Sequence, residues 1–156
     1  MSITVFIDVT TTHQMFDELI DALKIIEYQI GDRRPGPALD ALTYNVAYGL
    51  RESASRRTGK DTYTLFQTYL IETDGWEQVV HIDESAINPK GERPYTYGLS
   101  HHNENPYFED AIAFDADDLI EFEFEQLANA LDALFVDNRH AFPTRYSESN
   151  RIHNYG

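Results

Sequence analysis

The side chains with the clearest chemical potential in this chain are carboxylates gathered in one stretch. Between Arg93 and Arg139 there is no Lys or Arg, and eleven acids occur: Glu104, Glu109, Asp110, Asp115, Asp117, Asp118, Glu121, Glu123, Glu125, Asp132 and Asp137. Clustered carboxylates can act as general acids. On an amphipathic helix, however, a run of charge is typical of a solvated face. We therefore predict an acidic face made by Asp117, Asp118, Glu121 and Glu125.

Histidine offers the second candidate chemistry. His101 and His102 stand beside Glu104, and these residue types can bind a metal. Adjacent residues seldom bind one ion, however, and no HExxH or comparable paired spacing occurs. No P-loop, GxGxxG or GxSxG motif occurs either. The sequence therefore predicts no catalytic, cofactor-binding or metal-binding residues, and we do not expect an enzyme.

Charge and composition limit the class of partner. The chain has 156 residues, with 27 acids against 12 Lys and Arg and a formal net charge of -15. This balance argues against a surface that binds DNA phosphates. A large acidic excess suits proteins that stay soluble in concentrated salt, so a halophilic origin and an ordinary acidic protein are both open. With no Cys and no apolar run of ~18 residues, we expect neither disulfides nor a membrane span.

One long helix, from Pro106 to Phe135, is predicted to carry most of the acids. Its apolar residues recur at steps of three and four, the spacing of one helical face: Ile112, Ala116, Ile120, Phe124, Leu127, Leu131 and Leu134. Pro106 suits a first helical turn. A competing interpretation is local, because EFEFE at 121–125 alternates with period two and would give a strand edge or a kink.

The other patterns predict an α+β fold, with about three helices packed on a small antiparallel sheet. The helical patterns begin near Thr11 and near Pro37, and the hairpin signal Asp74-Gly75 joins two strands. In order, the predicted elements are a strand at 3–9, helices at 11–31 and 37–57, strands at 62–71 and 77–83, a loop at 84–93, a third strand at 94–99 and the long helix. We expect one domain, residues 1–135, and an extended C-terminal arm, residues 136–156.

A group of Tyr, Phe and Arg residues is predicted to form an interface. Tyr and Arg are enriched where proteins meet, and the tyrosines lie outside the clearest amphipathic stripes. Core packing remains an equal alternative for those tyrosines. We expect a neighbouring subunit to hold the arm. The predicted interface residues are Tyr95, Tyr97, Tyr107, Phe108, Arg139, Arg145, Tyr146 and Arg151.

The order of short motifs from about residue 17 to residue 134 carries a family resemblance. The motifs are Thr58-Gly59 before Leu65, then Tyr95 with Tyr97-Gly98, and Pro106-Tyr107-Phe108 with Ala111. This order resembles the tail-completion, or head-to-tail neck, proteins of long-tailed phages and related archaeal viruses. The chain departs from the family pattern where Tyr107 separates Pro from Phe and where Gly98-Leu99-Ser100 replaces the usual Glu-Gly-Thr.

The resemblance implies a structural virion component without a cofactor. Such a protein forms a homo-oligomeric ring, hexameric in related tails, between the head connector and the tail tube, and contacts other neck and tail proteins. It is assembled in the host cytoplasm, and genome DNA passes through it without specific binding. The acidic face then either borders the channel, where it repels phosphates, or faces solvent. Alternatives are a tail-terminator protein that caps the tube, an acidic DNA-mimic inhibitor and, last, a small hydrolase using His101 or His102.

Overall fold

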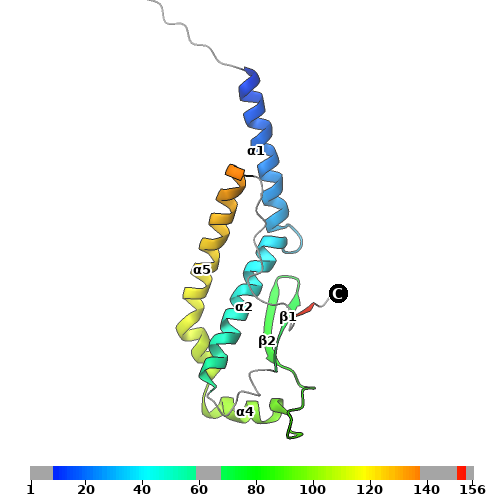
Figure 1. The fold of residues 1–156 in the computed structure, drawn as a ribbon, viewed down its shortest axis with the longest axis vertical. Coiled ribbons are helices and arrows are strands. Elements are labelled where there is room, and N and C mark those ends of the chain that lie inside the picture. The colour runs from blue at the N-terminus through cyan, green and yellow to red at the C-terminus, as the bar shows by residue number, and fades with distance from the viewer. Residues whose placement is uncertain (1–8, 59–67, 138–150, 154–156) are drawn as a thin grey trace, which may run out of the picture.

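A computed structural model describes residues 9–58, 68–137 and 151–153 (Figure 1). The fold is α+β, as predicted. Within these residues there are four α-helices and three β-strands: α1 (Val9–Ile30), α2 (Pro37–Arg57), β1 (Tyr69–Asp74), β2 (Glu77–Ile82), α4 (Pro94–Glu104), α5 (Tyr107–Asp137) and β3 (Arg151–His153).

Helix α2 is the central element, with α5 on one side and the strands on the other (Figure 1). Pro37 occupies its first turn, and Arg56 and Arg57 end it where the helix dipole favours cations. Its buried positions are mostly small residues, which let α5 approach closely. At Gly49 an added Cβ would lie 2.7 Å from Leu119 Cδ2 of α5. Burial on both sides explains why α2 is less clearly amphipathic than a surface helix.

The three strands form a mixed sheet in the order β2-β1-β3. Strands β1 and β2 pair antiparallel through the predicted Asp74-Gly75 turn, where Gly75 has a φ of +56° that favours glycine. Strand β3 pairs with β1 in parallel. The prediction of a purely antiparallel sheet is thereby corrected, because the third strand comes from the C-terminal arm.

The predicted strand at 94–99 is wrong, because this segment begins the helix α4. Pro94 is suited to the first turn of a helix. The spacing of Tyr95 and Tyr97 is also compatible with a strand, which was the structure predicted for this segment. The long helix is confirmed and runs without interruption through 121–125, so the competing strand interpretation is excluded. Helix α1 begins at Val9, two residues before the expected Thr11. The predicted strand at 3–9 otherwise lies outside the described residues, as do residues 59–67 and 138–150.

Candidate functional site

The inner face of α5 is the face that packs on α2. It includes Tyr107, Ala111 and Leu127, all buried. Three members of the predicted apolar stripe are instead exposed: Ile112 at 57%, Ile120 at 41% and Phe124 at 52%. The predicted apolar stripe is therefore divided, with Leu127 buried and these three residues exposed. The contact with α2 follows a row of positions at steps of four from Tyr107, and that row includes two acids.

Glu123 is the first of these inner acids, and it is completely buried. Asn45 of α2, also completely buried, donates a hydrogen bond from Nδ2 to Glu123 Oε2 at 3.1 Å. Burying a polar group is costly unless it is hydrogen-bonded. The pair therefore fixes how α2 and α5 align and does not act as a surface charge.

Asp115 is the second inner acid. Arg57 Nη1 donates to Asp115 Oδ2 at 2.8 Å, and the Ser53 hydroxyl donates to the same oxygen. The Ser53 hydrogen bond, and after it the Arg57 hydrogen bond, hold the pKa of the Asp115 carboxyl below its ordinary value of 3.8. Asp115 thus joins α5 to the last turn of α2.

An aromatic cluster fills the space where β1, α4 and α5 meet. Tyr69 and Tyr107 are fully buried, and burial raises the pKa of both phenols. Tyr107 Oη donates to the carbonyl of Gly98, 3.4 Å away. The interface prediction for Tyr107 is corrected, because its side chain lies in the core of its own chain.

The other predicted aromatic interface residues lie at different depths. Phe108 packs against the same cluster, with its ring centroid 5.3 Å from that of Tyr69. Tyr97 also packs against it and is partly buried, whereas Tyr95 is 43% exposed. Of this group, Tyr95 offers the most surface to a partner.

The outer face of α5 carries the predicted acids. Asp117, Asp118, Glu121 and Glu125 are all exposed. Among the described residues none of the four forms an ion pair. Exposed apolar side chains lie in the two rows of positions, at steps of four, on either side of the row Asp117, Glu121 and Glu125. One row holds Ile112, Ile120 and Phe124, and the other holds Phe114 and Phe122 together with Asp118. This outer face combines repulsion of anions with surface suited to protein contact.

Helix α1 presents a second exposed apolar surface. Its N-terminal half stands clear of the other described elements (Figure 1). Four large apolar side chains at helical spacing are exposed on it: Phe16 at 58%, Leu19 at 45%, Ile20 at 48% and Leu23 at 53%. Contiguous apolar surface of this kind marks protein interaction sites. The sequence spacing places these residues on one helical face, but periodicity does not reveal whether another element covers that face.

Arg151 of β3 is the one predicted arm residue within the described residues. Its side chain is 1% exposed and lies among Asp40, Tyr44 and Thr73, which we call the Arg151 seat. Nε donates to Thr73 Oγ1 at 2.8 Å, and Nη2 donates to Asp40 Oδ1 at 2.5 Å. The guanidinium lies 4.4 Å from the Tyr44 ring centroid.

Arg151 was predicted as an interface residue, and in the structure its side chain is buried in the Arg151 seat of its own chain. Sequence reasoning had no pattern for this contact, since β3 has only three residues. The remaining predicted arm residues, Arg139, Arg145 and Tyr146, lie outside the described residues.

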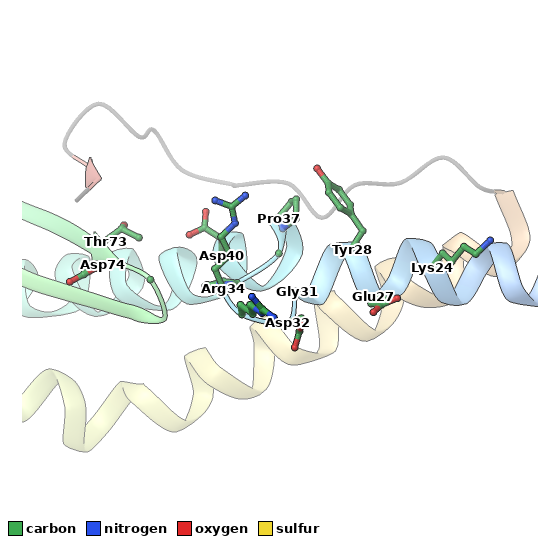
Figure 2. Close-up of a pocket in the computed structure, with 14 residues that line it drawn as sticks. Lys24, Glu27, Tyr28, Gly31, Asp32, Arg34, Pro37, Asp40, Thr73 and Asp74 are labelled. Carbon is green, nitrogen blue, oxygen red and sulfur yellow. The ribbon is translucent and has the colours of Figure 1, made fainter. Parts of the chain in front are cut away.

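An open groove adjoins the seat, between the α1–α2 turn and the β1–β2 turn (Figure 2). Its lining mixes Lys24 and Arg34 with Glu27, Asp32 and Asp40. Charges of both signs give it no preference for an anionic or cationic ligand. No group of three His, Cys, Asp or Glu able to hold a metal occurs in the described part of the chain. His102 instead lies 2.8 Å from Glu109, measured from Nε2 to Oε2.

Comparisons with known proteins leave the family open. No protein-family model, no curated protein and no solved structure matches the chain. In the described ranges, none of the helices has the length and apolar character needed to cross a membrane. The exposed surfaces of α1, α5 and the sheet are the features of this protein that bear on its function.

Proposed function

We propose that this protein is a structural component of a tailed virus, a tail-completion or neck protein that forms a ring between the head connector and the tail tube. The proposal begins from the order of motifs along the chain. The role proposed for the protein is structural and non-enzymatic. A tail-terminator that caps the tube is the nearest alternative within the same class.

The observation that carries the proposal is the pairing of exposed acids with exposed apolar flanks on α5. Apolar side chains such as Ile120 and Phe124 lose contact with water when copies associate. The carboxylates between the flanks add little to association energy, since exposed ion pairs contribute ~0–1 kcal/mol. In a ring, such a surface lets the flanks make contacts while the acids stay in water.

The proposed role of the acids is to keep DNA from adhering. DNA binding is supplied largely by Lys and Arg that neutralise phosphates, and the outer face of α5 has neither. If this face borders the channel, the genome slides past it. If it faces outward, it serves solubility instead, and the two placements differ in their effect on DNA ejection.

The first test is assembly of the purified chain. Native mass spectrometry and negative-stain imaging in molar salt should detect closed rings, because salt shortens the Debye length to ~3 Å at 1 M and screens the acidic copies from one another. A chain that stays monomeric at every salt and protein concentration contradicts the proposal.

The second test neutralises the outer face in virions, through Asp117→Asn, Asp118→Asn, Glu121→Gln and Glu125→Gln together. Rings and particles should still form, and DNA ejection should slow if the helix borders the channel. A charge-matched control on α1 changes Asp17, Glu18, Asp21 and Glu27 in the same way. Loss of ring formation in the α5 variant alone would refute the role given to these acids.

A DNA-mimic inhibitor is the second candidate, favoured because the same four acids are exposed and form no ion pair within the described part of the chain. A mimic must present its carboxylates as a spaced array to a basic enzyme. The fourfold variant should then lose binding to that enzyme altogether, whereas a ring protein has no such partner. Capture of a nuclease or polymerase by the parent chain and not by the variant would favour the mimic.

A further inference from the structure

The contact between β3 and the body of the protein has the character of a docked peptide. Arg151 reaches a carboxylate, a hydroxyl and an aromatic ring, which come from α2 and β1. Buried Arg and Tyr are the residues that dominate binding at interfaces. The strand itself adds to the edge of β1, a recurring mode of peptide recognition. The Arg151 seat and the β1 edge therefore form a receptor for a short strand that contains Arg.

The receptor and the chain that fills it lie on opposite sides of α2. Helix α5 flanks α2 on one side, and the sheet with β3 lies on the other (Figure 1). Residues 138–150 join Asp137 to Arg151. At 3.3–3.6 Å per residue they reach at most about 45 Å. The end of α5 lies on the α5 side, and β3 lies on the sheet side.

The two sides also share exposed apolar surface. On α5 it includes Ile120 and Phe124, at 41% and 52% exposure. On the outer face of the sheet, Val79 and Ile152 are 47% and 39% exposed, and the strand register places both beside Glu72. A ring needs a heterologous interface, in which one side of a copy meets a different side of the next. These two sides are suitable partners for such an interface.

We propose that β3 is exchanged between neighbouring copies when the protein assembles, so that Arg151 of one copy occupies the Arg151 seat of the next. When the α5 side of one copy faces the sheet side of its neighbour, the arm reaches that neighbour's β1 without passing around α2. In the exchanged form Arg151 makes the same contacts with Asp40, Tyr44 and Thr73, but these residues belong to the neighbouring copy. Exchange of an identical element is a low-cost route to assembly. The inference rests on the proposed ring, and its occupant is a second copy of this chain.

The test uses disulfide trapping between differently labelled chains. The parent chain has no Cys, and Glu72 and Ile152 are register partners on adjacent strands, a separation that a disulfide can bridge. One chain carries Glu72→Cys and the other carries Ile152→Cys, so neither can form an intrachain bond. After mixing, assembly and mild oxidation, mass spectrometry should find the mixed disulfide dimer as the main product. The matched control replaces Glu72→Cys with Glu77→Cys on the far strand β2, and should give little of it.

A directional variant separates exchange from random collision. Arg151→Ala placed in the Ile152→Cys chain removes the anchor from the donated strand and should reduce the mixed disulfide at least tenfold. The same Arg151→Ala placed in the Glu72→Cys chain leaves the seat intact and should leave the yield within twofold of the parent pair. Because both arms carry the same substitution, a general folding defect would lower both yields together.

Each outcome decides the inference. Rings that form without the mixed disulfide overturn the exchange and leave the proposed ring standing. Equal yields from the two Arg151→Ala arms, whether high or low, also overturn the exchange. A chain that never assembles overturns the proposed function and the exchange with it.

Discussion

The two faces of α5 place the same residue types in opposite circumstances. On the inner face, Asp115 accepts hydrogen bonds from Ser53 and Arg57 of α2. Two residues further on, Asp117 is exposed on the outer face. Glu123 and Glu125 repeat the contrast, since the first is completely buried and the second is exposed. A carboxylate on α5 stabilises the fold where α2 provides a hydrogen-bond donor opposite it. Elsewhere on the helix it is exposed to solvent.

The apolar residues of α5 divide in the same way. Tyr107 and Leu127 lie inside, whereas Ile112 and Phe124 are exposed, although the sequence predicts Ile112, Phe124 and Leu127 on one stripe. Inner apolar residues stabilise the isolated chain by leaving water on folding. Outer ones can contribute only when another molecule covers them. The contrast gives the inner face its role in folding and leaves the apolar residues of the outer face available for the proposed assembly.

The largest expected effect comes from truncating an aromatic residue on each face. Tyr107→Ala should lower the free energy of unfolding by about 3–5 kcal/mol, the range for large aromatic residues in cores. Phe124→Ala should change it by less than about 0.5 kcal/mol, as surface substitutions do, and should weaken assembly instead. Urea denaturation and native mass spectrometry measure the two quantities. Equal destabilisation by both variants would mean that the flank is covered within the isolated chain.

An intermediate effect is expected for the buried acid. Glu123→Ala removes the buried hydrogen bond that Asn45 Nδ2 donates to Glu123, and losing one partner of a buried hydrogen bond costs about 1–3 kcal/mol. Glu123→Gln retains an acceptor oxygen and should cost less. The matched outer variant, Glu125→Ala, should lie near zero in the same thermal and urea measurements. If the Glu125 variant were the more destabilised, the assignment of the two faces would be reversed.

The extents of α2 and α5 could be predicted from local signals. Pro37 marks the start of α2, and Arg56 with Arg57 marks its end, as the structure has it. The acids of the outer face were predicted as solvated because charge runs on helices face water. Each of these predictions uses only interactions between near neighbours in the chain.

Which face of α5 is buried could not be predicted, because the partners are distant. Ser53, Arg57 and Asn45 lie between 58 and 78 residues before the acids they contact. Steps of four advance about 40° around a helix with 3.6 residues per turn, so a row in contact with α2 drifts across the apolar stripe. A prediction of the buried face from hydrophobicity alone would not choose this row, because it contains Asp115 and Glu123.

The C-terminal strand was missed for a related reason. Three residues are too few to establish a period-two pattern, and most strands are longer. The position of β3 depends on the contact between Arg151 and Asp40, which lies 111 residues earlier in the chain. The nearby charge pattern of the arm gives no sign of such a partner.

The smallest expected effect concerns pH and separates Asp115 from Asp117. Because its hydrogen bonds lower the pKa of Asp115 in the folded state below 3.8, its stabilisation is fully present above that value. The stabilisation is lost as the pH falls through the folded pKa. Asp115→Asn should therefore be less stable than the parent at pH 7, by less than about 1 kcal/mol since the pair is only partly buried. This difference should shrink in more acidic solution.

Asp117→Asn provides the matched control for this measurement, since it removes the same charge from the outer face of the same helix. Melting temperatures of the three proteins across pH 2.5 to 7, at one ionic strength, give the comparison. The gap between the parent and Asp115→Asn should close at the acid end, while no gap of this kind opens for Asp117→Asn. A gap for Asp115→Asn that stays constant down to the lowest pH would trace the loss to packing, and the contrast between the two faces would no longer depend on charge.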